Sequence, residues 1–388
     1  MQHRPDEFES ISESAPLVDE LRDRIRATGP ITFRAFMQDA LYHPRYGYYT
    51  RHAGAMSRGG DYVTSPEVHS IFGALVAKQV AELWRTMGEP PRFDIVEQGA
   101  GTGKLAHDIL RWAEAQDLAF ASALRYRIVE VLPAARGLQE QTIAGAGDAA
   151  CRVEWHSELP SGIEGCVLSN ELLDAFPVHR VVREGAELRE VYVRLSEDDR
   201  FEDQLGPLSD SALARYFDAL GLVPGEGCYA EVNLDAPRWF ASAARSIDRG
   251  YVLTFDYGYD AADLYAPWRR DGTLLCFYRQ TASSDPYQRI GKQDMTASID
   301  FTTMRRAGEA AGLDTIGYTN QAEFLVRLGI GEGIAAIARS RPNEMEEYFA
   351  RRKVVLTLID PGHLGRIKVL LQGKGVPQAS PCGFRDGA

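Results

Sequence analysis

The spacing of apolar residues along the chain changes near residue 93, and the two spacings predict different elements. Before that point the apolar residues recur at helical intervals, which is typical of amphipathic helices. Helices are expected over residues 16–30, 32–42 and 66–88. Pro66 in the first turn of the third helix and Gly88 beyond its end are usual at helix ends. The Gly- and Tyr-rich segment before Pro66 is either a surface loop with packed aromatic residues or a flap that faces a substrate.

From Phe93 onward, short apolar runs alternate with helical patterns. This alternation is typical of a parallel sheet with helices on both faces, an α/β fold. The expected strands are "FDIVEQG" (93–99), "YRIVEVL" (126–132), "RVEWHS" (152–157), "GCVLSN" (165–170), "GYVLTFDYG" (250–258), "TIGYTN" (315–320) and "RIKVLLQGK" (366–374).

Roughly eighty residues separate the fourth expected strand from the fifth, far more than a simple crossover needs. This segment has the pattern of a hairpin at residues 179–195 and of two helices, near 211–220 and 236–248. We therefore expect an inserted lid over residues 175–250. The expected domains are a helical N-terminal cap with its loop, residues 15–65, and a core, residues 66–378, that includes the lid.

Composition indicates a soluble enzyme: the chain of 388 residues is 45% hydrophobic and 25% charged. Its net charge of −12 gives no general attraction to nucleic acid or anionic lipid, so neither a nucleic-acid partner nor membrane insertion is expected. The five cysteines are scattered without a Cys-x-x-Cys pair, which predicts reduced thiols and no metal site. Since the first residues match neither a secretory signal nor a transit peptide, a cytoplasmic location is expected.

The stretch "EQGAGTGKL", residues 97–105, is a glycine loop between an expected strand and a helix. A nucleotide P-loop needs a glycine five positions before Gly103 and a hydroxyl residue after Lys104; Gln98 and Leu105 occupy these positions, so that interpretation fails. A dinucleotide fingerprint needs its third glycine where Lys104 stands, which weakens that interpretation.

The remaining pattern, an acidic residue that ends a strand followed by G-x-G-x-G, resembles motif I of class I S-adenosylmethionine-dependent methyltransferases. Gly99, Gly101 and Gly103 would let the backbone approach the methionine part of the ligand. Glu97 would lie near the ligand's ammonium group. Glu130, at the end of the next strand, would accept the ribose hydroxyls, as acidic residues do in other doubly wound sheets.

Further stretches make the resemblance specific: "GDYVTSPEVHSIFG", "IVEQGAGTGKL", "SNELLDAFPVHRV", "FDYGY" and "MTASIDFTTMRRAG" occur in this order. Together they resemble the MidA-like family, whose eukaryotic members are mitochondrial protein-arginine methyltransferases of respiratory complex I assembly. The resemblance runs from about Gly29 to Gly373. It implies a Rossmann-like class I fold with a seven-stranded, mainly parallel sheet, S-adenosylmethionine as cofactor, and a helical cap and lid over the site.

Further cofactor contacts are open to two interpretations each. Thr64 and Ser65 either start a helix or, as the resemblance implies, also border the cofactor's carboxylate. Trp155 either flanks the adenine or belongs to the core. Asn170 would meet the cofactor through its backbone or its amide.

The candidate residues for the methyl acceptor also have two interpretations each. Glu171 and Asp174, three positions apart, would face one side of a first helical turn, either as helix-terminal charges or as carboxylates that hold a guanidinium. His179 is the candidate general base for a hydroxyl acceptor, or else a strand histidine. Asp256 and Tyr257 either line the acceptor pocket or form a turn.

The sequence thus predicts a methyltransferase, with protein arginine as the leading acceptor. A respiratory complex subunit is one expected acceptor. Two alternatives remain: a small-molecule O-methyltransferase on the same core, and an assembly chaperone that binds the cofactor without turnover.

Overall fold

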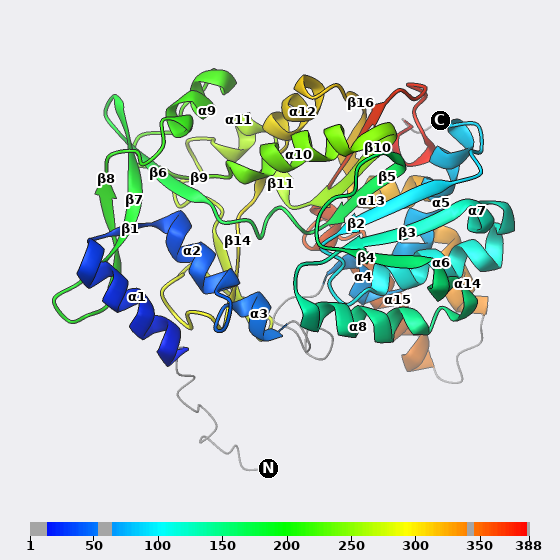
Figure 1. Ribbon diagram of the computed structural model, residues 1–388, viewed down its shortest axis with the longest axis horizontal. Helices are drawn as coiled ribbons and strands as arrows, with labels where there is room; N and C mark the ends of the chain where they lie inside the picture. Colours follow the sequence, from blue (N-terminus) through cyan, green and yellow to red (C-terminus); the bar gives the residue numbers. More distant parts are fainter. Residues whose placement is uncertain (1–13, 53–63, 340–344, 386–388) are drawn as a thin grey trace, which may run out of the picture.

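The computed structural model describes residues 14–52, 64–339 and 345–385. Two lobes lie side by side in Figure 1, one built on a seven-stranded sheet and the other on a smaller antiparallel sheet. Residues 53–63 of the Gly- and Tyr-rich segment lie outside the described residues.

The central sheet contains all seven strands expected from the sequence. They are β2 (Phe93–Gln98), β3 (Leu124–Val129), β4 (Val153–His156), β5 (Ile163–Asn170), β10 (Ile247–Asp256), β16 (Asp314–Asn320) and β17 (Lys368–Lys374). Their order is β16-β17-β10-β5-β2-β3-β4, and β17 is antiparallel to both of its neighbours while the other adjacent pairs are parallel. The carboxyl ends of six strands therefore meet at one edge, where ligands bind in open α/β sheets.

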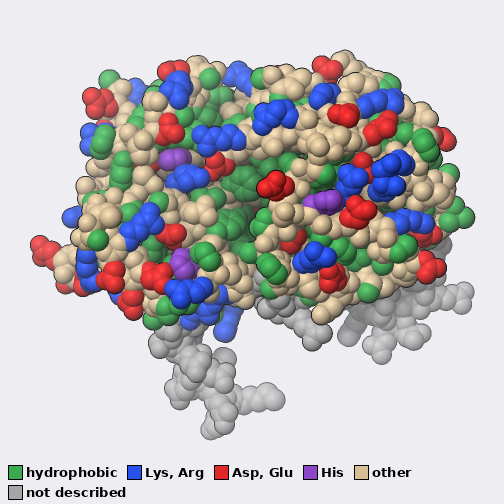
Figure 2. Space-filling model, viewed as in Figure 1, with side chains coloured by type: hydrophobic (Ala, Val, Ile, Leu, Met, Phe, Trp, Pro, Cys, Tyr) green, Lys and Arg blue, Asp and Glu red, His purple; other side chains and the backbone are tan. Residues whose placement is uncertain are grey.

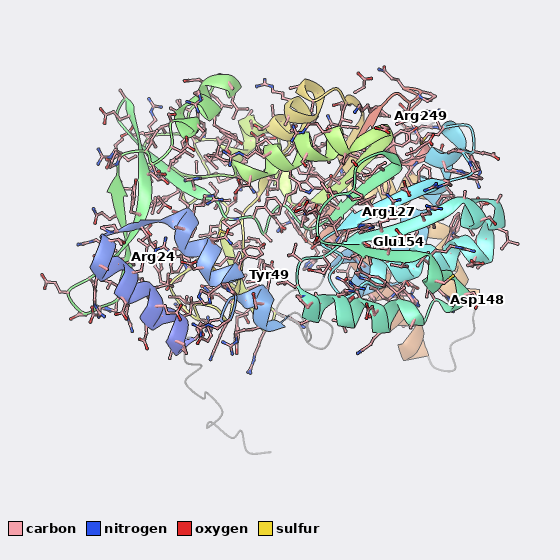
Figure 3. The ribbon with its side chains drawn as sticks, in the orientation of Figure 1. Arg24, Tyr49, Arg127, Asp148, Glu154 and Arg249 are labelled. Carbon is pink, nitrogen blue, oxygen red and sulfur yellow. The ribbon has the colours of Figure 1, made fainter. Side chains whose placement is uncertain are left out.

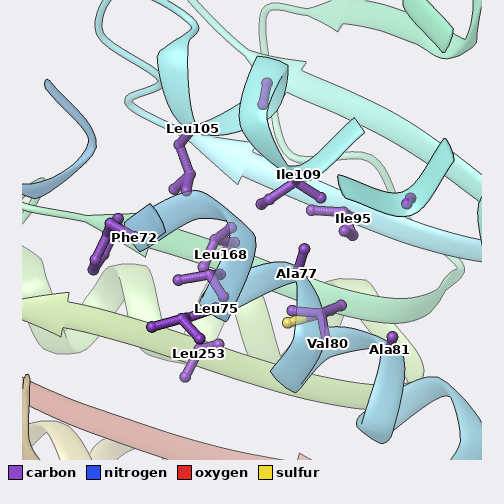
Figure 4. Packing of buried hydrophobic residues seen from close by; sticks show 14 of the residues in the cluster. Phe72, Leu75, Ala77, Val80, Ala81, Ile95, Leu105, Ile109, Leu168 and Leu253 are labelled. Carbon is purple, nitrogen blue, oxygen red and sulfur yellow. The ribbon is translucent and has the colours of Figure 1, made fainter. Parts of the chain in front are cut away.

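Helices cover both faces of this sheet because its central strands are apolar on both sides. The helices are α5 (Ile71–Thr86), α6 (Lys104–Gln116), α7 (Leu118–Ala123), α8 (Pro133–Ala144), α10 (Asp235–Ser246), α12 (Phe301–Ala310), α13 (Gln321–Leu328), α14 (Ile330–Arg339) and α15 (Met345–Thr357). Ile95, Leu168 and Leu253 pack against α5 and α6 on one face (Figure 4). Their neighbours Val96 and Val252 pack against α10 and α12 on the other. Each such side chain contributes about 1.5–3 kcal/mol by leaving water.

The third helix expected near the N-terminus is interrupted. α4 (Ser65–Val68) ends at His69, whose backbone is extended at φ −165° and ψ 142°, and α5 begins at Ile71. The break turns the short α4 toward the glycine loop, where the Thr102 hydroxyl donates a hydrogen bond to Glu67.

The second lobe joins the N-terminal segment to the inserted one. Its sheet contains β1 (Ile31–Thr32), β6 (His179–Glu184), β7 (Glu187–Leu195), β8 (Phe201–Gly206) and β9 (Tyr229–Val232), with β6 and β7 forming the expected hairpin. β1 pairs with β7, so residues expected to form a separate cap share a sheet with the insertion. The helices of this lobe are α1 (Ala15–Thr28), α2 (Phe33–Tyr42), α3 (Tyr48–His52) and α9 (Ala212–Leu220).

Short elements connect the lobes: α11 (Ala261–Leu264), β11 (Gly258–Tyr259) paired with β15 (Ile299–Asp300), and β12 (Leu275–Tyr278) between β13 (Thr281–Ser283) and β14 (Asp294–Thr296). Three 3-10 helices cover Gly147–Arg152, Leu364–Arg366 and Cys382–Phe384. Within the described ranges, no helix is long and apolar enough to cross a bilayer.

Candidate functional site

The glycine loop connects β2 to α6 through three residues with positive φ. Gly99, Gly101 and Gly103 have φ of 74°, 52° and 82°. A Cβ on Gly99 would lie 2.8 Å from Leu172 Cδ1, and one on Gly103 would lie 3.1 Å from the backbone of Gln139. A Cβ on Gly101 would meet no atom within 4 Å. Packing therefore explains the two outer glycines, whereas Gly101 faces open space in which a ligand can lie against the backbone.

Glu97, the acidic residue before this loop, is buried and accepts a hydrogen bond of 2.6 Å from the Tyr126 hydroxyl. Burial raises the pKa of Glu97 to about 7, although the bond from Tyr126 opposes the rise. Its expected contact with the ammonium group of the cofactor stays a prediction.

A hydrogen-bond network surrounds Glu130, just after β3. Its two carboxylate oxygens accept from the Leu132 amide at 2.8 Å and from Gln139 Nε2 at 2.9 Å. The same Gln139 amide donates to the Gly101 carbonyl at 3.1 Å, and its oxygen accepts from Trp155 Nε1 at 3.0 Å. Gln139 was missed in the sequence; the available signal was a polar residue on the buried side of the α8 pattern. It brings three predicted residues, Gly101, Glu130 and Trp155, together.

A second group of predicted residues meets at the end of β5. Glu171 Oε1 accepts from the Ser65 amide and from Asn170 Nδ2, both at 3.0 Å. Ser65 is fully buried, and its hydroxyl donates to Gln321 at 2.9 Å. Thr64 precedes it and is half-buried. Asn170 Oδ1 is buried and has no hydrogen-bond partner within the described part of the chain.

The expectation that Glu171 and Asp174 share a first helical turn is wrong. Residues 171–178 form bends and a turn, not a helix. Glu171 has φ of 50°, and its amide donates to the Phe255 carbonyl at 2.8 Å, which pulls the loop onto β10. A non-glycine residue held in this conformation stores strain, which is often found at functional sites. Glu171 consequently faces Ser65, and Asp174 faces a different group of acids.

These acids form a buried cluster between the lobes, made of Asp174, Asp256 and Asp294. Burial, together with the charges of Asp256 and Asp294, raises the pKa of Asp174 well above its ordinary value. Burial, partly offset by a bond of 2.8 Å from the Leu173 amide, raises the pKa of Asp256 to about 7, and the charge of Glu171 adds to the rise. A cation placed among these carboxylates would relieve their mutual repulsion.

Two stacked tyrosines of the second lobe adjoin the acid cluster. Tyr42 and Tyr49 lie 5.2 Å apart between ring centroids. Tyr49 donates to Asp294 Oδ1 at 2.8 Å, and Tyr42 donates to the Ala175 carbonyl at 3.0 Å. Figure 3 shows Tyr49 on the side of its lobe that faces the central sheet. The roles of Asp294, Tyr42 and Tyr49 were missed in the sequence, where only the abundance of tyrosine pointed to this segment.

The structure places His179 elsewhere, at the start of β6. Its Nδ1 lies 2.7 Å from Glu190 Oε1, and Glu190 Oε2 accepts from the Ser209 amide at 2.5 Å. Burial opposes ionisation of Glu190, but these hydrogen bonds hold its pKa below its ordinary value. The arrangement favours the strand-histidine interpretation. In the described residues, no group of three or more His, Cys, Asp or Glu is arranged to hold a metal ion.

The sequence model of a family of S-adenosyl-L-methionine-dependent methyltransferases matches residues 75–319, well over half of the chain. The chain belongs to this family. It is an S-adenosyl-L-methionine-dependent methyltransferase.

The alignments with relatives cover most of this chain. It is 30% identical to the mitochondrial protein arginine methyltransferase NDUFAF7 homologue of Drosophila melanogaster, over 93% of this chain and 85% of that protein. It is 29% identical to the mitochondrial NDUFAF7 of Mus musculus, over 81% and 74% respectively. A solved structure from Burkholderia thailandensis, bound to S-adenosyl-homocysteine, has a TM-score of 0.87 and 31% identity over 100% of this chain and 98% of that chain.

The residues of this methyltransferase fit the cofactor of its family. Gly101 leaves the open space against the backbone, and the Asn170 amide offers a buried oxygen without a partner among the described residues. The Glu130 carboxylate lies one residue beyond the next strand, where it can bind ribose hydroxyls. Figure 2 shows the surface hollowed between the lobes, with hydrophobic side chains exposed in the hollow.

Proposed function

We propose that this protein transfers a methyl group from S-adenosylmethionine to an arginine side chain of a protein acceptor. The observation that carries the proposal is the buried cluster of Asp174, Asp256 and Asp294 beside the stacked Tyr42 and Tyr49. A guanidinium is cationic and planar, so carboxylates can bind its edge while aromatic rings lie along its faces. The names of the Drosophila and mouse relatives support the same acceptor class.

When bound, S-adenosylmethionine supplies an activated methyl group for an in-line displacement. The glycine loop and Glu130 hold the donor, and the acid cluster holds the acceptor within about 3 Å and in line. Carboxylates orient the guanidinium and stabilise its charge. The nitrogen that gains the methyl group loses a proton. The cationic guanidinium favours the ionised form of Asp174 when it binds, and this carboxylate is the proposed proton acceptor.

The insertion over residues 175–250 is proposed to act as a lid together with the N-terminal segment 15–65. Arg34 of α2 and Asp235 of α10 form an ion pair of 2.5 Å, and Tyr42 bonds to Ala175, so both contacts link the N-terminal segment to the insertion. We propose that these contacts hold the two segments together as one lid over the acceptor in the core domain, residues 66–378. A respiratory complex subunit as acceptor and a cytoplasmic location stay predictions.

Isosteric variants of the acids test the proposed acceptor. Asp174→Asn and Asp294→Asn keep size but remove charge, so turnover on an identified arginine acceptor should fall at least about tenfold, which corresponds to about 1.4 kcal/mol of transition-state stabilisation. Affinity for S-adenosyl-homocysteine, measured by calorimetry, should change little. Asp148→Asn is the matched control, because Asp148 is an exposed carboxylate at the far end of the central lobe (Figure 3).

His179→Ala separates the alternatives. An O-methyltransferase predicts a severe defect in this variant that higher pH partly restores, together with tolerance of Asp174→Asn. A chaperone predicts normal binding of S-adenosyl-homocysteine without turnover on any protein of a demethylated extract. Either result would contradict arginine methylation.

A further inference from the structure

A pocket of about 440 Å³ opens at the carboxyl edge of the central sheet. We call it the carboxyl-edge pocket. Its lining includes Tyr257, Asn320, Glu323, Arg366 and Lys368. None of these residues binds the glycine loop or Glu130 in the described contacts, so the pocket is separate from the cofactor contacts given above.

Strand register places this pocket next to the acids. Lys368 begins β17 and lies directly opposite Asp256 of β10 on one side and Asn320 of β16 on the other. Directly opposed residues of antiparallel strands project to the same face and lie about 5 Å apart. Tyr257, which lines the pocket, directly follows Asp256 in the chain. The pocket and the acid cluster therefore share the end of β10.

Two cations give the pocket its charge. The Arg366 guanidinium is exposed and lies 5.3 Å over the Tyr257 ring, and the Lys368 ammonium lies 5.8 Å from the Tyr318 ring. Neither cation has a carboxylate within 4.0 Å in the part of the chain that the structure describes. The acidic lining residue, Glu323, is engaged by the Thr319 hydroxyl at 2.6 Å and by Arg327 at 3.3 Å. The hydrogen bond from Thr319 and, more weakly, the charges of Arg327 and Lys368 lower the pKa of this carboxyl group.

We propose that the carboxyl-edge pocket binds a carboxylate side chain of the acceptor polypeptide, close in sequence to the target arginine. The inference rests on the proposed arginine methylation. The acid cluster binds the cationic guanidinium of the target arginine, and Lys368 and Arg366 bind the carboxylate of a nearby acceptor residue. One segment of the acceptor therefore occupies two subsites of opposite charge. This pairing selects arginines that lie in an acidic context and rejects those flanked by lysine. Because the protein as a whole carries a net charge of −12, such selection depends on these local cations.

The test uses synthetic peptides with one arginine, flanked by Glu in one set, by Gln in a second and by Lys in a third. Methylation rates give KM, and fluorescence anisotropy in the presence of S-adenosyl-homocysteine gives binding without turnover. The wild-type protein should favour the Glu peptides over the Gln peptides at least about threefold in both measurements, and high salt should reduce the preference.

Arg366→Glu and Lys368→Glu should abolish that preference and favour the Lys peptides instead. Arg200→Glu, at an exposed position on the turn between β7 and β8, is the matched control and should keep the wild-type preference. Thermal denaturation of each variant checks that it folds.

The outcomes separate the two proposals. Methylation of all three peptide sets without a charge preference would overturn the pocket assignment and leave arginine methylation standing. Charge-dependent binding without any methylation would refute arginine methylation and support the pocket. Equal binding of all peptides by the wild-type protein, or an unchanged preference in Arg366→Glu, would overturn the pocket.

Discussion

At the scale of single residues, the glycine loop contains glycines with different neighbours. Gly99 and Gly103 face Leu172 and Gln139, so their absence of a side chain serves packing. Gly101 combines a φ of 52° with open space around its missing Cβ. Of these three glycines, only Gly101 is therefore expected to accept a substitution that weakens ligand binding without a steric clash in the folded protein.

Gly101→Ala should abolish or strongly weaken binding of S-adenosyl-homocysteine, because the new methyl group enters the space where the ligand approaches the backbone. The control is Gly185→Ala, at the tip of the β6–β7 hairpin, with a φ of 60° and similarly open space. Both variants should lose about 1 kcal/mol of stability from backbone strain. Calorimetry and thermal denaturation give both quantities. Equal affinity in the two variants would contradict the motif assignment.

Some site residues could be placed from the sequence and others could not, for a physical reason. Glu97, Glu130 and Asn170 lie at or just after strand ends, so the local strand pattern was enough to bring them to one edge. Asp294 and Tyr49 come from segments 245 positions apart, and no periodicity pairs such residues. The left-handed backbone of Glu171 is set by its bond to Phe255, which only the folded sheet provides.

At the scale of elements, two glycines of the central strands β5 and β10, Gly165 and Gly250, have φ of 156° and 150°, so a Cβ on either would point at the neighbouring strand. A Cβ on Gly165 would lie 2.0 Å from the Asp94 carbonyl oxygen, and a Cβ on Gly250 would lie 1.9 Å from that of Gly165. The apolar runs were sufficient to predict these strands, but not the positive φ of the two glycines. The two-residue β1 has no periodicity at all, so its pairing with β7 was not predictable.

Gly165→Ala should destabilise the protein by about 3 kcal/mol or more, because backbone on the adjacent strand cannot yield as a flexible side chain would. Gly137→Ala is the control; it lies in α8, its Cβ would meet no atom within 4 Å, and it should be neutral or stabilising. Urea denaturation of both variants measures the difference. A Gly165→Ala protein as stable as the control would contradict this expectation.

At the scale of the whole molecule, several buried carboxyl groups have pKa values raised toward neutrality. The pKa values of Glu97 and Asp256 are each about 7, and burial is the first cause in both. The folded protein therefore holds protons that the unfolded chain releases near pH 4. Stability from these groups is fully present below the unfolded pKa and is lost as pH rises to about 7. Repulsion within the net charge of −12 also destabilises the folded protein as pH rises. Only a comparison between variants therefore isolates the contribution of one carboxyl group.

Glu97→Gln provides that comparison, since glutamine keeps the shape and still accepts the bond from Tyr126. Near pH 4 the wild-type side chain is protonated and both proteins should be about equally stable. As pH rises to about 7, the wild type must either retain its proton or bury a charge. It should therefore lose stability relative to Glu97→Gln, by about 1.4 kcal/mol for each pH unit that separates the pKa of Glu97 in the unfolded chain from its pKa in the folded protein. Above pH 7 the difference should stay constant.

Free energies of unfolding from urea titrations across this range give the two curves. Curves that remain parallel from pH 4 to pH 8 would contradict this prediction. They would show that the pKa of Glu97 is the same in the folded protein as in the unfolded chain.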